Sequence, residues 1–313
     1  MKFISSKAIV LTFLGLILYL TFDFYNKKEE DFWQLNYDWQ NTEVIENLGK
    51  GQIKSVETNF VEISFKNDVT YNQGNTLQLE LSNEKYFFSF ENAYVKDKII
   101  KFTGGFWVLD KPIPNHEKVE AKIINLPLKQ TGEIKISLIT DSQLLWRGGR
   151  SFRKWIKEKE TRFSFVGDKI DLYGLPYTGE ILNTTEKASH NLEEIPFANV
   201  YVVSLGTHDP KNDIANSLIN YKLIIERILA QNKSAKIYLI NIPPSLNLKR
   251  NAHYIKYNEA LNHLSSRNIF IVDFYSLIEN QQEKLESKDK IHYNANAYKL
   301  LAKQLIKQIN GEK

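Results

Sequence analysis

The chain has 313 residues, of which 42% are hydrophobic and 12% aromatic, enough apolar material for the cores of about two domains. Its 41 basic and 37 acidic side chains nearly balance, and the lysines are scattered, which argues against a dedicated nucleic-acid binder. Because the chain has no cysteine, disulfides, thiolate catalysis and cysteine-based metal sites are excluded.

An uncharged apolar run, Ala8–Phe22, follows Lys2 and Lys7 near the N-terminus. At 1.5 Å per residue such a run spans ~22 Å, so flanking residues must extend it to cross a ~30 Å hydrocarbon core. The alternatives are a cleaved signal peptide and a buried helix of a soluble protein. The run lacks a small-x-small cleavage pattern at its end, and no lipoprotein cysteine follows. We predict that residues 1–30 form an uncleaved signal anchor and linker, with the rest of the chain exported.

Residues 31–131 are dominated by short runs in which apolar and polar residues alternate, the pattern of half-buried strands. Asn, Asp, Gly and Pro separate these runs and mark turns. The predicted strands are Val56–Phe65, Thr76–Ser82, Tyr86–Phe90, Ile99–Phe102 and Val119–Ile124. The pattern indicates a small antiparallel β-sandwich-like domain. Phe106 and Trp107 fit either a core or a sugar-stacking platform, and the core is the commoner use.

From residue 132 to 313 apolar runs alternate with helical patterns, which is typical of a parallel sheet covered on both faces. The predicted strands are Ile134–Ile139, Phe163–Val166 or Ile170–Tyr173, Val200–Leu205, Lys236–Ile242 and Ile269–Val272. The predicted helices are Arg150–Lys159, Thr178–Asn191, Asn212–Asn232, Tyr254–Ser265 and Asn294–Ile309.

Three polar motifs lie where these elements end. Asp141-Ser142 follows the first strand, Gly206–Asp209 follows the Val200–Leu205 strand, and Asp289 and His292 precede the last helix. The carboxyl ends of parallel strands meet at one edge, so we expect the first two motifs to face a common crevice. A carboxylate three residues before an imidazole can accept its Nδ1–H and leave Nε2 free to deprotonate a serine. Each motif alone also fits a turn or a helix cap.

In this order the motifs resemble those of the SGNH/GDSL hydrolase superfamily, from about Gly132 to the C-terminus. The Asp141-Ser142 pair matches the family's nucleophile block, and Asp289 with His292 matches its D-x-x-H block. The resemblance implies a three-layer flavodoxin-like domain. It also implies that Ser142 is the nucleophile, that His292 is its base and that Asp289 orients the histidine. No metal and no cofactor is implied.

The resemblance further implies an oxyanion hole built from a glycine N–H and an asparagine side chain. Gly174 is the best match for the glycine and Gly179 the fallback. This sequence departs from the pattern at His208, which stands in place of the asparagine, and at Thr140, which stands in place of the first-block glycine. A neutral imidazole can donate one hydrogen bond, so we predict that His208 binds the oxyanion.

The resemblance implies a serine-dependent ester hydrolase. With a membrane anchor and a β-rich domain, we expect an O-acetyl esterase acting on acylated envelope or extracellular carbohydrate, in the periplasm or outside the cell. One alternative is an O-acetyltransferase that modifies cell-envelope polysaccharide with a multi-spanning acyl-donor protein as partner. Another is a catalytically decayed binding or scaffold protein. We expect no nucleic-acid partner.

Overall fold

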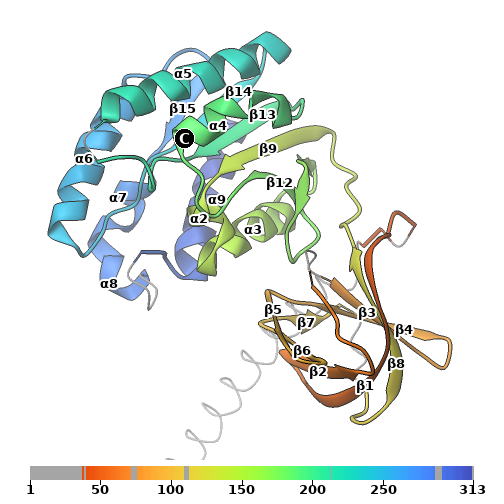
Figure 1. Ribbon diagram of the computed structural model, residues 1–313. Helices are drawn as coiled ribbons and strands as arrows, with labels where there is room; N and C mark the ends of the chain where they lie inside the picture. Colours follow the sequence, from red (N-terminus) through yellow and green to blue (C-terminus); the bar gives the residue numbers. More distant parts are fainter. Residues whose placement is uncertain are drawn as a thin grey trace, which may run out of the picture. The chain divides into compact units, whose positions relative to one another are not determined.

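The structure is a computed structural model that describes residues 37–38, 40–71, 76–108, 113–211, 213–285 and 291–311 (Figure 1). The chain divides into two compact units, Met1–Leu126 and Pro127–Lys313, so the division falls shortly before the predicted boundary. The predicted signal anchor at residues 1–30 lies outside the described residues. Among the helices that the structure describes, none combines the length and apolar content that a membrane span requires.

The described part of the first unit is a single antiparallel sheet. Its strands are β1 (Glu43–Glu57), β2 (Phe60–Phe65), β3 (Thr76–Leu81), β4 (Glu84–Ser89), β5 (Asn92–Lys96), β6 (Ile99–Thr103), β7 (Phe106–Trp107) and β8 (Lys118–Asn125). Their order across the sheet is β5-β6-β2-β1-β8-β3-β4-β7. The strand predicted over Val56–Phe65 is instead the hairpin of β1 and β2, because a turn at Thr58-Asn59 interrupts it without breaking the alternation of the sequence.

This sheet curls around its own core. Phe102 on β6 and Phe90 just after β4 have ring centroids 4.7 Å apart, although four strands lie between β6 and β4 in the sheet order. In a flat sheet, strands five places apart would be separated by about 24 Å. The sandwich prediction is therefore corrected to one curled sheet. Trp107 packs against Phe88 with centroids 5.1 Å apart, which favours its reading as part of the core.

The second unit contains the predicted parallel sheet. Its strands are β9 (Ile134–Thr140), β10 (Phe163–Val166), β11 (Lys169–Ile170), β12 (Pro176–Gly179), β13 (Val200–Ser204), β14 (Lys236–Ile240) and β15 (Ile269–Val272). The parallel order β10-β9-β13-β14-β15 is 2-1-3-4-5 in chain order, the flavodoxin-like arrangement. Strand β12 lies parallel to the end of β9, and β11 pairs antiparallel with β12. The α/β sheet prediction is confirmed.

Helices cover both faces of this sheet (Figure 1). They are α2 (Ser142–Leu145), α3 (Ser151–Lys159), α4 (Thr185–His190), α5 (Ile214–Gln231), α6 (Leu248–Asn262), α7 (Phe274–Ile278), α8 (Gln282–Leu285) and α9 (Ala295–Asn310). Successive strand residues point to opposite faces. Accordingly Ile237 and Leu239 join the core formed with α4, α5 and α6, whereas the Tyr238 hydroxyl donates to the Gln308 carbonyl of α9.

Two predicted helices begin elsewhere than expected. The helix predicted over Thr178–Asn191 starts as strand β12 and becomes helical only at Thr185, because the Thr184 side chain caps α4 by accepting from the Lys187 N–H. Helix α6 begins earlier than predicted, because Asn247 caps it through the Arg250 N–H. The first of these shifts leaves a short loop, residues 180–184, beside the end of β9.

Candidate active site

The ends of β9 and β13 bring two of the polar motifs together. The two strands pair with Ser204 opposite Thr140, and the Asp141 N–H donates to the Ser204 carbonyl at 3.1 Å. Asp141 caps α2, which places Ser142 at the first residue of that helix. Gly206 adopts a φ of +107°, and a Cβ there would lie 2.6 Å from the Tyr257 ring. The Gly206–Asp209 loop therefore needs glycine at its start to pass this ring.

Ser142 and His292 form the pair predicted from the sequence. The Ser142 Oγ lies 3.0 Å from the Nε2 of His292, and both side chains are buried, with exposed fractions of 2% and 7%. This is the separation at which an imidazole can take the proton of an attacking hydroxyl. Asp289, predicted to orient the ring, lies outside the described residues. The structure thus brings Ser142 and His292, which are 150 residues apart in the chain, into the contact that the predicted nucleophile and base require.

His208 approaches the same serine from another side. Its Nε2 lies 3.1 Å from the Ser142 Oγ. Burial and the nearby His292 lower the pKa of His208, so the ring is neutral near pH 7. One arrangement suits all three groups: Ser142 donates its proton to His292 and accepts the Nε2–H of His208. A neutral ring in that tautomer donates at the site where an asparagine amide would.

We expect His208→Ala to lower kcat for an ester substrate by about 10²–10³-fold, because one donor to the oxyanion is lost. His208→Asn restores an N–H donor and should recover most of that loss. The measurement is kcat and KM for p-nitrophenyl acetate with the two variants in parallel. Equal activity of His208→Ala and the unaltered protein would exclude this role for the ring.

Asp141 is a buried carboxyl directly before Ser142. It accepts the Gln143 N–H at 2.8 Å. Burial raises its pKa from 3.8 to about 7, while the hydrogen bonds from Gln143 and Thr207 act in the opposite direction. Near neutral pH the folded protein therefore holds a proton on Asp141 that the unfolded chain releases.

The raised pKa gives stability a defined pH dependence. The folded state binds more protons than the unfolded state between pH 3.8 and about 7, so the free energy of unfolding falls as pH rises through this window. The full difference is about 4 kcal/mol. We expect Asp141→Asn, which keeps the acceptor for Gln143, to be more stable than the unaltered protein at pH 8, with the advantage vanishing towards pH 4. Urea unfolding across this range measures it, and a constant difference would contradict the assignment.

Asp209 connects the Gly206–Asp209 loop to two helices. Its carboxylate accepts from the Thr185 N–H at 2.9 Å, the Thr185 hydroxyl at 2.7 Å and the Tyr257 hydroxyl at 2.8 Å. These bonds tie the loop that carries His208 to α4 and α6. Asp213 caps α5 through the Asn216 N–H. No group of three or more His, Asp or Glu side chains in the described parts of the chain is arranged to hold a metal ion.

The structure corrects the assignment of Gly174. Its N–H closes a turn by donating to the Asp171 carbonyl at 2.9 Å, so it is committed within the loop between β11 and β12. The fallback, Gly179, ends β12 and pairs with Thr140 next to the nucleophile motif. A Cβ on Gly179 would lie 2.2 Å from the Thr140 carbonyl oxygen, which explains the glycine by close backbone approach. The residues that follow Gly179 are the ones that reach Ser142.

Sequence reasoning missed Gln143. This buried side chain donates from Nε2 to the Ile291 carbonyl at 3.3 Å and accepts at Oε1 from the Tyr298 hydroxyl at 3.0 Å. It therefore links the helix that carries Ser142 to the segment that carries His292. Nothing in the sequence distinguishes Gln143 from a surface glutamine, because its partners are more than 140 residues away.

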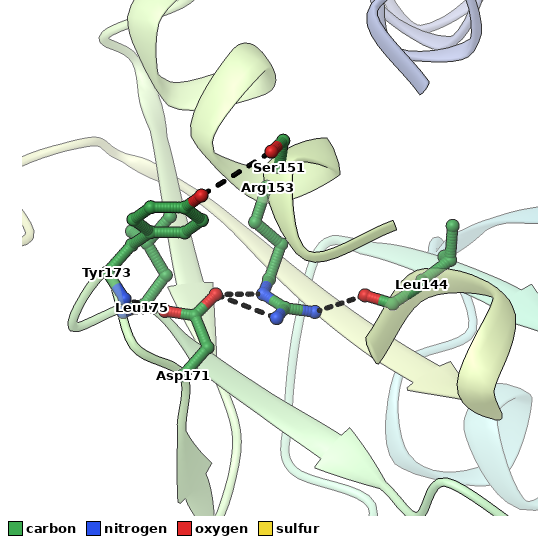
Figure 2. A network of polar contacts seen from close by, with 6 residues as sticks. All are labelled: Leu144, Ser151, Arg153, Asp171, Tyr173 and Leu175. Atoms are coloured by element: carbon green, nitrogen blue, oxygen red, sulfur yellow. Dashed lines mark hydrogen bonds and ion pairs between the residues drawn. The ribbon is translucent and has the colours of Figure 1, made fainter. Parts of the chain in front are cut away.

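Sequence reasoning also missed Arg153, whose side chain bonds to the backbone of α2 (Figure 2). The fully buried guanidinium donates from Nε to Asp171 at 2.8 Å, and its Nη2 lies 2.7 Å from the same oxygen. Its Nη1 donates to the Leu144 carbonyl at the end of α2, at 3.4 Å. Asp171 in turn accepts the N–H groups of Tyr173 and Leu175, both at 2.9 Å. One ion pair thus joins the nucleophile helix to the Gly174 loop.

Residues 178–305 match the sequence model of the GDSL-like Lipase/Acylhydrolase family. The C-terminal unit is therefore similar to a GDSL-like lipase/acylhydrolase over this segment, and we refer to it as the GDSL-like domain. The matched segment contains His208 and His292 and begins after Ser142, so the prediction that Ser142 is the nucleophile rests on its motif and on its contact with His292. Proteins with this domain act on ester bonds, and the site described above has the groups for that chemistry.

Several solved structures are similar to the GDSL-like domain. A carbohydrate esterase of family 3 from Talaromyces cellulolyticus is 17% identical with a TM-score of 0.47, over 57% of this chain and 100% of that chain. A lipase/acylhydrolase from Enterococcus faecalis is 17% identical with a TM-score of 0.46, over 57% and 96%. The catalytic domain of a peptidoglycan O-acetyltransferase from Streptococcus pneumoniae is 15% identical with a TM-score of 0.42, over 58% and 95%. The sequence matches no curated protein.

Proposed function

We propose that the GDSL-like domain cleaves carboxylic esters through an acyl-serine intermediate at Ser142. The observation that carries the proposal is the buried contact of 3.0 Å between the Ser142 Oγ and the His292 Nε2, with the ring of His208 at 3.1 Å on the same oxygen. A hydroxyl held between a base and a neutral donor is arranged for attack on a carbonyl carbon.

The proposed reaction has two steps. In the first, Ser142 attacks the carbonyl, its proton passes to His292, and the charge that develops on the carbonyl oxygen is stabilised by His208. His292 then gives the proton to the leaving alcohol. In the second step His292 activates the acceptor that resolves the acyl-serine. Water as acceptor gives hydrolysis, and a sugar hydroxyl gives transfer of the acyl group.

For the substrate we propose O-acetyl groups on envelope or extracellular carbohydrate, with water as the acceptor. Support for this part comes from the sequence: the apolar run Ala8–Phe22 fits an anchor that exports the domain, and the β-rich unit fits an accessory domain. We propose a periplasmic or extracellular location on that basis. A transferase would instead pass the acetyl group to envelope polysaccharide, with a multi-spanning acyl donor as partner.

The test compares acyl groups and acceptors. We expect turnover of p-nitrophenyl acetate to exceed that of p-nitrophenyl octanoate, and acetate to be released from an O-acetylated oligosaccharide in water. Octanoate as the only ester turned over would contradict the O-acetyl proposal. Acetylated oligosaccharide formed from p-nitrophenyl acetate, in excess over free acetate, would favour the transferase. Ser142→Ala supplies the background rate in each assay.

A further inference from the structure

The loop after β12 places a backbone carbonyl in the position that a substrate oxyanion requires. The Ser142 N–H donates to the Ile181 carbonyl oxygen at 3.0 Å. The N–H of a nucleophilic serine and the side chain beside it are the groups that hold an oxyanion during acyl transfer. The Ile181 carbonyl oxygen therefore occupies the place in the oxyanion hole where a substrate oxyanion would bind the Ser142 N–H.

The filling carbonyl belongs to the central peptide of a β-turn. Glu180 to Asn183 form the turn, closed by the Asn183 N–H on the Glu180 carbonyl at 3.2 Å. Both ends of the turn are fixed on one residue: the Glu180 N–H and the Asn183 side chain donate to the Thr140 carbonyl at 3.3 and 3.2 Å. Ile181 and Leu182 between them are exposed, with fractions of 46% and 63%. The middle of the turn can therefore rotate while its ends stay in place.

A β-turn has two common forms that differ by rotation of this central peptide. In type I both central residues have negative φ, and in type II the second has positive φ. Neither Ile181 nor Leu182 has positive φ here, so the turn is of the type I kind. The C=O and N–H of one peptide point in opposite directions. Conversion to a type II turn therefore moves the Ile181 carbonyl away from Ser142 and turns the Leu182 N–H towards Ser142.

We propose that the Ile181–Leu182 peptide flips during the reaction, emptying the oxyanion hole and supplying the Leu182 N–H as its third donor. This inference rests on the proposed function and adds a catalytic group to it. The Leu182 N–H would take the oxyanion-binding role that the sequence assigned to the N–H of Gly174, and a backbone N–H at this place does not require glycine. The left-handed conformation has a higher free energy for leucine than for glycine. Leu182 therefore favours the type I turn in the resting protein, with the Ile181 carbonyl on the Ser142 N–H.

Two substitutions of Leu182 test its backbone preference and its N–H donor separately. Leu182→Gly keeps the N–H and removes the penalty for positive φ, and we expect about tenfold faster reaction with a fluorophosphonate probe. Leu182→Pro removes the N–H, and we expect at least about 10²-fold slower reaction. The control Ile219→Ala shortens an exposed side chain on α5, outside the turn and the site, so its rate should be unchanged. Equal rates for Leu182→Gly and the unaltered protein would contradict the claim that Leu182 holds the resting turn in the type I form.

The crystal structure of the phosphonylated full chain is the deciding measurement. Fluoride leaves as the Ser142 Oγ bonds to phosphorus, and the serine proton passes to His292. We expect the Leu182 N–H and the Ser142 N–H on the phosphoryl oxygen, with the Ile181 carbonyl turned away. A complete adduct in which the Ile181 carbonyl still accepts from Ser142 would overturn the flip alone. Failure of folded protein to form any adduct at Ser142 would overturn the proposed function instead.

Discussion

His292→Ala is expected to lower kcat for p-nitrophenyl acetate by about 10⁴–10⁶-fold, and Ser142→Ala by a similar factor. The reason is that the two side chains are expected to act as one unit across the 3.0 Å contact: the hydroxyl is a weak nucleophile without its base, and without Ser142 no acyl-enzyme can form. The double variant should therefore be no slower than either single variant. Steady-state kinetics of the three proteins measure this.

The matched control for this cycle is His190→Ala, which removes an exposed imidazole at the end of α4. It should leave kcat unchanged. Multiplicative losses in the double variant would show that Ser142 and His292 work independently. Circular dichroism spectra of all four variants should coincide, because each site change removes few atoms from an intact sheet.

Arg153→Ala is expected to have the largest effect on stability, about 3–5 kcal/mol of unfolding free energy. The substitution leaves the carboxylate of Asp171 buried without its cation and removes the donor to the Leu144 carbonyl (Figure 2). Burial already raises the pKa of Asp171, and Arg153 is the main group opposing that rise. Urea unfolding followed by tryptophan fluorescence gives the free energy.

A second substitution distinguishes lost charge pairing from lost packing. In the double variant Arg153→Met/Asp171→Asn, neutral groups of similar size replace the ion pair, and the new amide oxygen can still accept from Tyr173 and Leu175. We expect it to recover most of the stability. Arg162→Ala removes a half-exposed guanidinium from its ion pair with Glu160 and should cost within about 1 kcal/mol. A loss in the double variant as large as in Arg153→Ala would show that packing dominates.

The sequence predicts the site residues well where they lie at the ends of strands. The motifs at Ser142 and His208 follow apolar runs that form β9 and β13, and parallel strands necessarily bring such ends together. His292 was found because it precedes a helix whose cap, Asn294, and apolar period are both visible. For these three residues, local pattern and tertiary placement agree.

The sequence does not predict the site groups whose role depends on the direction of a backbone N–H or carbonyl. Gly174 and Gly179 are both glycines near a turn, and only the pairing of β12 with β9 shows which lies beside the nucleophile. The role of the Ile181 carbonyl cannot be read from residue types, because any residue carries the same group. The curled sheet of the first unit was missed for a related reason, since alternation fixes which side of a strand is buried and leaves its pairing open.

The central claim is that Ser142 is a nucleophile activated by His292. Its most direct test is intact mass measurement after treatment with a fluorophosphonate probe, followed by peptide mapping. The account predicts one adduct per chain, on the peptide that contains Ser142, in the unaltered protein and a rate at least about 10³-fold lower in His292→Ala. Folded protein that stays unlabelled, or carries its label on another residue, would contradict it.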